Sequence, residues 1–348
     1  MAVHHASDIQ QLQRLPWFHL LAALGALYLG AVTLRLLVYL GLPNFLRSPT
    51  PTDLRRRYGA WAVVTGPTSG IGRSMAFELA RRGLNVVLVG RDPGKLRDVS
   101  DTITKTHAGV QTKTVLFDLA FVSTAQGEEA MRRLREVVDG LDVGLLVNNA
   151  GVAKPCAVYL HEFDVDAWVK MIRVNLWALT EVTAAVLPGM VARRRGAIVN
   201  IGSGSTEAIP SFPLYTIYAA TKRYVSQFSR SLYVEYRSKG IHIQCQAPLF
   251  VDTKMASSVT KAKRFSPFVP TSDAYAHAAV RWIGHGALCV PNAGHRVQRC
   301  LAAVVPDCIH DWLRLREHLR QRALFQRLRS ARAAPSTSTI GTTFREKS

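Results

Sequence analysis

The chain has 348 residues, of which 48% are hydrophobic, and its formal net charge is +20. This apolar content excludes disorder of the whole chain, and the length corresponds to one large domain or two small ones. Five cysteines without a CxxC pair argue against a disulfide framework or a zinc site, and the eleven histidines show no metal-like spacing. Because no nucleic-acid-binding motif is present, we expect the positive charge to attract an acidic membrane surface or a phosphate-bearing ligand.

An apolar segment, residues 17–42, follows an N-terminal tail of residues 1–16. About 20 apolar residues are enough for a helix to cross a bilayer. Trp17 and Tyr39 stand where interfacial aromatic residues belong, and Arg35 lies near one end, where its side chain can reach the interface. The segment therefore predicts a transmembrane anchor.

The charges beside this segment predict its orientation. One arginine, Arg14, precedes the segment, and four follow it: Arg47, Arg55, Arg56 and Arg57. The positive-inside rule then places the downstream domain in the cytosol. A cleaved signal peptide is disfavoured because the segment is long and no small-residue cleavage site follows it, whereas a monotopic hairpin stays open.

Strand-like and helix-like runs alternate after the anchor. We predict helices at residues 73–82, 166–190 and 215–238, and strands at residues 62–65, 85–89, 114–117, 141–147, 197–201 and 241–246. This alternation predicts a Rossmann-type α/β fold, a doubly wound parallel sheet with helices on both faces. The domain should cover residues 55–306. A basic amphipathic helix (307–332) and a disordered tail (333–348) should follow.

A glycine-rich segment, Thr65 to Gly72, lies between the first strand and the first helix. Glycines permit a tight turn, and the helix N-terminus attracts a pyrophosphate, so the segment predicts a dinucleotide site. The predicted binding residues of this turn are Gly66, Thr68, Ser69, Gly70, Ile71 and Gly72.

The end of the second strand predicts which dinucleotide binds. The strand is followed by Gly90 and Arg91 instead of an acidic residue, and Arg73 adds a second cation beside the turn. A guanidinium can pair with a 2′-phosphate, so NADP(H) is favoured. Asp92 lies one residue too late to bind the ribose in its place.

Tyr218 and Lys222 stand four residues apart on a predicted helix, so they share one face. A phenol titrates near pH ~10. A neighbouring ammonium stabilises the phenolate and makes the group a usable proton donor. Such a pair is common by chance and gains meaning from the motifs around it.

Taken together, these motifs resemble the short-chain dehydrogenases/reductases. The TGxxxGIG turn, the run Asn148 to Gly151, and Asn175, Ser203, Tyr218 and Lys222 occur in the family's order over roughly residues 60–255. The resemblance implies that Tyr218 protonates the substrate oxygen and that Lys222 binds the nicotinamide ribose and tunes Tyr218. It also implies that Ser203 bonds the carbonyl and that Asn175 holds a water in a proton relay.

The resemblance adds two cofactor-binding residues, Asn149 and Asp118, and leaves the catalytic serine open. The family's serine usually lies thirteen residues before the tyrosine, which gives Ser205. Aligning the end of the strand gives Ser203, which we prefer because the sheet fixes strand ends. Pro248-Leu249 also departs from the Pro-Gly of many members.

Three stretches narrow the resemblance: GAIVNIGSGS, YAATKRYVSQFSRSLYVEY and GIHIQCQAPLFVDTKMAS. They look like the very-long-chain 3-oxoacyl-CoA reductases of fatty-acid elongation, particularly those of plants. The resemblance implies NADPH-dependent reduction of a long-chain 3-oxoacyl-CoA at the endoplasmic reticulum membrane, beside other elongase subunits. A steroid or other lipid carbonyl reductase, and a non-catalytic elongase subunit, are the alternatives.

Overall fold

The computed structural model describes residues 16–39, 52–155, 157–257 and 268–333. The chain divides at residue 50 into two compact units. In the first, helix α2 (Pro16–Tyr39) is 24 residues long, with its described side chains mostly exposed. At 1.5 Å per residue it measures about 36 Å, so it fits the predicted transmembrane helix. Apart from Pro16 and Ala333, the predicted tails, 1–16 and 333–348, lie outside the described residues, as do Arg14 and Arg47.

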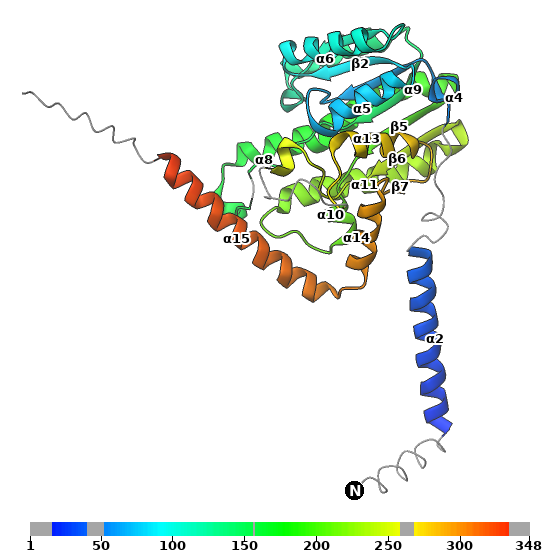
Figure 1. The fold of residues 1–348 in the computed structure, drawn as a ribbon, viewed down its shortest axis with the longest axis vertical. Helices are drawn as coiled ribbons and strands as arrows, with labels where there is room; N and C mark the ends of the chain where they lie inside the picture. Colours follow the sequence, from blue (N-terminus) through cyan, green and yellow to red (C-terminus); the bar gives the residue numbers. More distant parts are fainter. Residues whose placement is uncertain (1–15, 40–51, 156, 258–267, 334–348) are drawn as a thin grey trace, which may run out of the picture. The chain divides into compact units, whose positions relative to one another are not determined.

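The second unit is built on a seven-stranded parallel sheet of order β3-β2-β1-β4-β5-β6-β7 (Figure 1). This confirms the predicted doubly wound α/β fold. The strands are β1 (Trp61–Thr65), β2 (Asn85–Gly90), β3 (Thr112–Leu116), β4 (Val143–Asn148), β5 (Gly196–Ile201), β6 (Ile241–Gln246) and β7 (Leu288–Cys289). The two-residue strand β7 was not predicted, because so short a segment carries no readable period.

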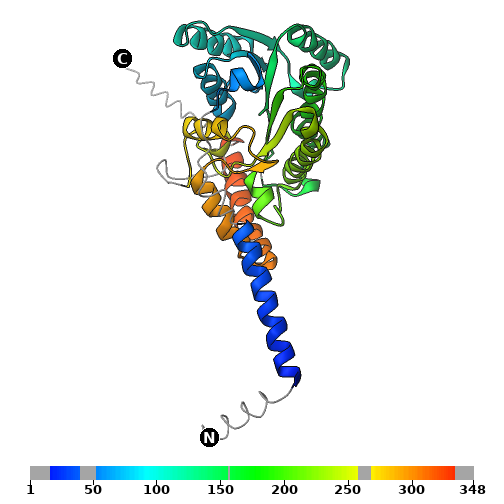
Figure 2. The same cartoon turned by 90° about the vertical axis from the view of Figure 1, so that its right-hand side faces the viewer.

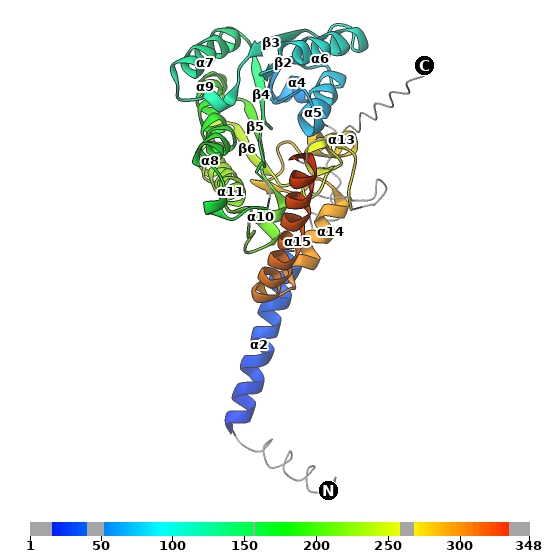
Figure 3. The ribbon, with the colours of Figure 1, turned by 90° about the vertical axis from the view of Figure 1, so that its left-hand side faces the viewer.

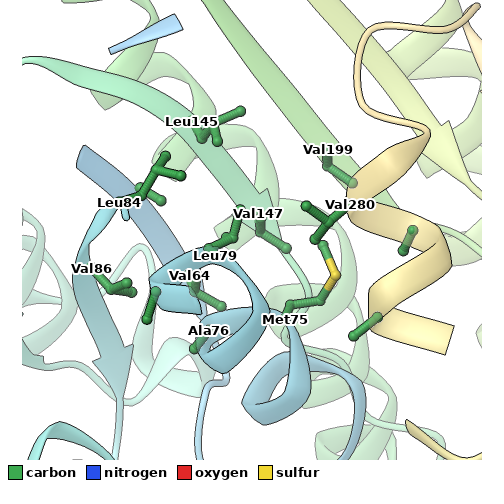
Figure 4. Packing of buried hydrophobic residues seen from close by; sticks show 14 of the residues in the cluster. Val64, Met75, Ala76, Leu79, Leu84, Val86, Leu145, Val147, Val199 and Val280 are labelled. Atoms are coloured by element: carbon green, nitrogen blue, oxygen red, sulfur yellow. The ribbon is translucent and has the colours of Figure 1, made fainter. Parts of the chain in front are cut away.

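Helices cover both faces of the sheet (Figure 3). One face packs against α5 (Gly70–Arg81), α6 (Pro93–Thr106) and α13 (Ser272–Arg281), and the other against α7 (Ala125–Val138), α9 (Ala178–Arg193) and α11 (Thr216–Tyr236). Figure 4 shows the first of these interfaces, where Met75 and Leu79 of α5 meet Val64, Val147 and other strand residues. Residues on both faces of the central strands are buried, which explains their continuous apolar runs.

The single helix predicted over residues 166–190 is interrupted in the structure. It consists of α8 (Val165–Ile172), a π-helical turn η3 (Arg173–Trp177) and α9. A π turn inserts one residue into the helical repeat and often marks a functional site. The turn contains Asn175, one of the predicted site residues.

The chain crosses over between β1 and β4. The strands before this point build the sheet outward to β3, and those after it build outward to β7. Ligands of such sheets bind beyond the carboxyl ends of the strands at this switch point. The loops after β1, β4 and β5 therefore border the expected site.

Short helices and the C-terminal part complete the domain. They are α4 (Leu54–Tyr58), η1 (Leu119–Phe121), η2 (Leu160–Glu162), α10 (Gly204–Ala208), η4 (Arg237–Lys239), α12 (Lys254–Ser257), α14 (Ala293–Ala303) and α15 (Asp307–Ala333). Helix α15 lies at the lower end of the domain in Figures 2 and 3. Its side chains bond to the segment between α10 and α11 and to η2.

Candidate active site

A cavity of about 390 Å³ opens at the carboxyl ends of the strands. Most of the predicted site residues line it: Gly66, Thr68, Ser69, Gly70, Ile71, Arg91, Asp118, Asn149, Ser203, Tyr218 and Lys222. Gly72 and Asn175 are absent from this lining. The structure thus brings the predicted cofactor residues and the predicted reactive residues into one cavity.

The glycine-rich turn has the tight geometry that a pyrophosphate site needs. Gly66 and Gly70 have φ angles of +65° and +53°, which glycine adopts without strain. A Cβ on Gly72 would lie 2.1 Å from Asn149 Nδ2 and 2.3 Å from the Gly66 carbonyl oxygen. The twelve-residue helix α5 begins in this turn, so its N-terminal dipole faces the cavity wall. These residues fit a dinucleotide.

Asn149 and Thr65 hold the turn against the loop that follows β4. Asn149 Nδ2 donates to the carbonyl oxygens of Thr65 and Gly66, both at 3.1 Å. Thr65 Oγ1 accepts from the backbone N–H groups of Asn149 at 3.0 Å and Ala150 at 3.1 Å. We did not predict this role for Thr65. The signal was a buried hydroxyl at the end of the first strand.

The charges after β2 and β3 are arranged around Arg91. Its guanidinium is 62% exposed and lies 3.8 Å from the Asp118 carboxylate. The Asp92 carboxylate caps α6 and pairs with Lys95, and its residue does not line the cavity. It therefore does not compete for the ribose.

Arg73 does not support the cofactor site in the way we predicted. Its guanidinium lies over the Phe77 ring, 4.6 Å from the ring centroid, and the residue is absent from the cavity lining. A long exposed side chain on α5 can pack along its own helix, so proximity in sequence to the turn did not fix its direction. Arg91 alone of these two cations borders the cavity.

Lys222 is buried at the base of the cavity, with 6% of its surface exposed. Its Nζ donates to the carbonyl oxygen of Ile201, the last residue of β5, at 2.8 Å. Desolvation of the ammonium lowers the pKa of Lys222 to about 8. Lys222 follows Tyr218 by one turn of α11, with three residues between them, and Tyr218 also borders the cavity.

Both candidate serines border the cavity. Ser203 is 5% exposed and caps the short helix α10, where its Oγ accepts from the Ser205 N–H at 3.3 Å. Ser205 is less buried. The Ser203 O–H therefore keeps its proton for donation while its oxygen is oriented by the backbone.

Asn175 fastens the loop after β4 to the reactive helix. Its Oδ1 accepts from Val152 N–H at 2.7 Å, and its Nδ2 donates to the Val152 carbonyl at 2.9 Å and to Thr221 Oγ1 at 3.1 Å. A Cβ on Gly151 would lie 3.5 Å from both Asn175 Oδ1 and Lys222 Nζ. The side chain thus holds the loop after β4 against α11, next to Lys222.

Helix α15 forms part of the cavity wall, which we did not predict. Arg314, His318 and Gln321 of this helix contribute to the lining. His318 is buried and meets the rings of Phe212 and Tyr215 edge to face. Its Nδ1 lies 2.6 Å from the Pro213 carbonyl, so Nδ1–H donates, and burial lowers the pKa of its imidazole.

The loop after β6 forms another wall. Leu249 stands where the resemblance predicts glycine in many relatives. It packs on Gly204, since a Cβ on Gly204 would lie 2.7 Å from Leu249 Cγ. Buried His295 accepts from the Leu249 N–H at 3.3 Å and bonds the Phe250 carbonyl at 3.0 Å. The loop is therefore fixed by a neutral imidazole, whose pKa is lowered by burial.

The short chain dehydrogenase family model matches residues 60–264, the segment that carries the glycine-rich turn, the reactive helix and most of the cavity wall. The chain belongs to the short-chain dehydrogenase family. This confirms the predicted resemblance, the oxidoreductase class and a nicotinamide cofactor. Among the described residues, no group of three or more His, Cys, Asp or Glu is placed to hold a metal ion.

Relatives within the short-chain dehydrogenases agree with the narrower resemblance. A very-long-chain 3-oxoacyl-CoA reductase-like protein of Arabidopsis thaliana is 44% identical over 310 residues, which cover 89% of this chain and 96% of the relative. The very-long-chain 3-oxoacyl-CoA reductase of Rattus norvegicus is 36% identical, over 73% of this chain and 78% of the relative. A protein of Pongo abelii named inactive hydroxysteroid dehydrogenase-like protein 1 is 38% identical, over 75% of this chain and 76% of the relative.

Solved short-chain dehydrogenases share the fold. A 7β-hydroxysteroid dehydrogenase aligns with a TM-score of 0.62 at 24% identity, over 77% of this chain and 98% of its own. A short-chain dehydrogenase from Sphingobium yanoikuyae in complex with NADPH aligns with a TM-score of 0.57 at 27% identity, over 82% and 99%.

Proposed function

We propose that the protein reduces very-long-chain 3-oxoacyl-CoA to 3-hydroxyacyl-CoA with NADPH as the reductant, as a step of fatty-acid elongation. The observation that carries the proposal is that Ser203, Tyr218 and Lys222 border the same cavity as the glycine-rich turn. A carbonyl held there would meet both a hydroxyl pair and the bound dinucleotide.

The residues divide the reaction in the following way. NADPH, when bound, supplies a hydride to the carbonyl carbon. Ser203 donates a hydrogen bond to the carbonyl oxygen, which stabilises the charge that develops there. Tyr218 Oη transfers its proton to that oxygen, and a hydroxyl and the oxidised cofactor result.

Lys222 prepares Tyr218 for this transfer. Its ammonium would stabilise the phenolate left on Tyr218 after the transfer. The low exposure of Lys222 strengthens this effect because the low dielectric reduces screening. Asn175 holds the loop after β4 against α11 beside Lys222 and acts as a positioning residue, since its amide is already bonded to Val152 and Thr221.

Arg91 supports NADPH as the cofactor. It follows β2 and borders the cavity. Its exposed guanidinium is only weakly paired, because its contact with the Asp118 carboxylate is 3.8 Å long. A 2′-phosphate would offer this guanidinium two oxygens. The test is the ratio of kcat/KM for NADPH to that for NADH, which Arg91→Ala should lower at least tenfold, while Arg73→Ala leaves it unchanged.

Three features support a long-chain acyl-CoA as the substrate and the endoplasmic reticulum membrane as the location. The Rattus norvegicus relative carries the name of that reductase, and the Arabidopsis thaliana relative is named as like it. Helix α2 is long and apolar enough to anchor the protein where long acyl chains partition. The net charge of +20 attracts the phosphates of coenzyme A. We propose that the catalytic domain faces the cytosol, beside other elongase subunits.

The substrate proposal is tested by incubating purified full-length protein with NADPH and a long-chain 3-oxoacyl-CoA and measuring the 3-hydroxyacyl-CoA by mass spectrometry. A ketosteroid serves as the competing substrate. Turnover of the ketosteroid alone would show that the substrate is a steroid instead of an acyl-CoA. If neither carbonyl were reduced, the protein would be a non-catalytic subunit.

The choice of serine is tested with a matched pair of variants. Ser203→Ala should lower kcat by 10²-fold or more, as loss of an oxyanion donor does. Ser205→Ala should lower it far less. The reverse order would assign the role to Ser205.

A further inference from the structure

An exposed surface of mixed apolar and basic character runs along α14 and α15. Leu301 and Val304, at the end of α14, are each 64% exposed, and Trp312 and Leu313 of α15 are 57% and 47% exposed. We call this the α14–α15 surface, and its members are Leu301, Val304, Ile309, Trp312, Leu313, Arg316, Arg320 and Leu324. Large side chains so exposed and so close in sequence exceed the scattered apolar residues of an ordinary surface.

The opposite side of α15 is fixed to the catalytic domain, so the outward direction of this surface is set. Asp311 accepts from Ser211, Gln321 accepts from Tyr215 Oη at 3.0 Å, and Arg322 pairs with Glu162. These contacts recur along the helix with His318 between them. Residues three and four apart share one face of a helix, so these contacts mark the inner side, and residues two positions from them, such as Leu313, Arg316 and Arg320, face outward.

The charge on the outward side is positive. Arg316 and Arg320 are exposed there, and the Arg316 guanidinium lies over the Trp312 ring at 5.3 Å. Of the three acidic residues of α15, Asp311 bonds inward, Glu317 accepts from Gln321 at 3.2 Å, and Asp307 lies in the first turn. Tryptophan, leucine and arginine on one exposed helix face are the composition of helices that lie in a membrane interface.

Helix α2 supplies the reason why a bilayer is within reach. Residues 40–53 connect Tyr39 of α2 to Leu54 of α4. Fourteen residues span at most about 50 Å. If α2 crosses a bilayer, the catalytic domain is tethered near its surface at high effective concentration.

We infer that the α14–α15 surface lies on the interface of an anionic lipid bilayer and makes a second membrane contact besides α2. The apolar side chains enter the headgroup region, and Arg316 and Arg320 meet lipid phosphates. Because Arg314, His318 and Gln321 of the same helix line the cavity, the contact would bring this part of the cavity wall close to the lipid surface. A water-insoluble substrate could then enter without crossing water.

The experiment uses the full-length protein in nanodiscs of phosphatidylcholine with brominated acyl chains, with and without phosphatidylserine. The difference in fluorescence quenching between wild type and Trp312→Phe reports the depth of Trp312 alone. We expect Trp312 to be quenched by the brominated lipid and protected from aqueous iodide when phosphatidylserine is present. Replacing Arg316 or Arg320 by glutamine should weaken docking about fivefold each.

Leu313→Glu should abolish the quenching of Trp312, whereas Val234→Glu is the matched control. Val234 is 72% exposed on α11, away from the α14–α15 surface, and its change should leave quenching as in wild type. Equal iodide quenching with and without anionic lipid, or protection that grows only with the number of chains per disc, would overturn the proposal. No turnover is measured, so failure here is separate from failure of the proposed reaction.

Discussion

Replacing Lys222 by methionine should change how the stability of the catalytic domain depends on pH. The side chain is buried, and desolvation lowers its pKa from 10.5 to about 8. Keeping the ammonium charged in the folded state at neutral pH therefore costs about 3 kcal/mol. Methionine has a similar length and carries no charge, so the variant is free of this cost at every pH.

The direction follows from proton binding. Between pH 8 and pH 10.5 the folded wild type has released the proton of Lys222, while the unfolded chain still holds it. The unfolded state binds more protons, so the stability of the wild type relative to the variant rises with pH across this window. The cost is fully present below pH 8 and is gone near pH 10.5.

The assay is thermal unfolding of full-length protein in detergent, without cofactor, at pH 7 and at steps up to pH 10.5. A change of about 3 kcal/mol corresponds to roughly 5–10 °C in Tm for a domain of this size. From pH 8 to pH 10.5, the Tm of the wild type should rise by that amount relative to the Tm of the variant. Groups other than Lys222 titrate in both proteins and cancel. A difference in Tm that stays constant with pH would refute the buried-ammonium description.

Two further substitutions probe the cofactor turn and the positioning residue. Gly72→Ala should raise the Kd for NADPH about 10–100-fold, since its Cβ would overlap Asn149 and the turn backbone at 2.1 and 2.3 Å. Gly94→Ala, whose Cβ meets only Asp92 Oδ1 at 3.5 Å, is the control and should bind as wild type in the same titration. Asn175→Ala should cost about 1–3 kcal/mol of stability and lower kcat more than it raises the KM for NADPH, because buried groups lose their partners. An effect on Tm without an effect on kcat would show a structural role only.

The parts of the site that the sequence predicted are those attached to strand ends. The turn after β1, Asn149 after β4 and Ser203 after β5 all follow short apolar runs, and a parallel sheet brings the ends of such runs to one edge. Local pattern and global fold agree at these positions, so the residues could be placed before any coordinates were known.

The π turn could not be predicted from the same kind of pattern. Residues 166–190 are apolar enough to suggest one continuous helix, and the insertion of a single residue at Arg173–Trp177 hardly changes that composition. The reason for the turn lies elsewhere: Asn175 bonds Val152 and Thr221, which belong to two other parts of the chain. A helix pattern cannot report such a tertiary contact.

The C-terminal helix shows a second limit. Its inner side contains His318, Gln321 and Arg322, and its outer side contains Trp312 and Leu313. Placing apolar residues inward by their period would therefore have turned the helix the wrong way. Its contribution to the cavity depends on partners about a hundred residues earlier in the chain, and no local signal identifies them.

The most direct test of the proposed reaction compares wild type with Tyr218→Phe. Purified full-length protein is given NADPH and a long-chain 3-oxoacyl-CoA, and cofactor oxidation and cofactor binding are measured separately. We expect the phenylalanine variant to bind NADPH as wild type does and to lose at least 10²-fold in kcat, because the proton donor is gone. A variant that turns over the substrate at the wild-type rate would contradict the assignment of Tyr218 and the reductase chemistry built on it.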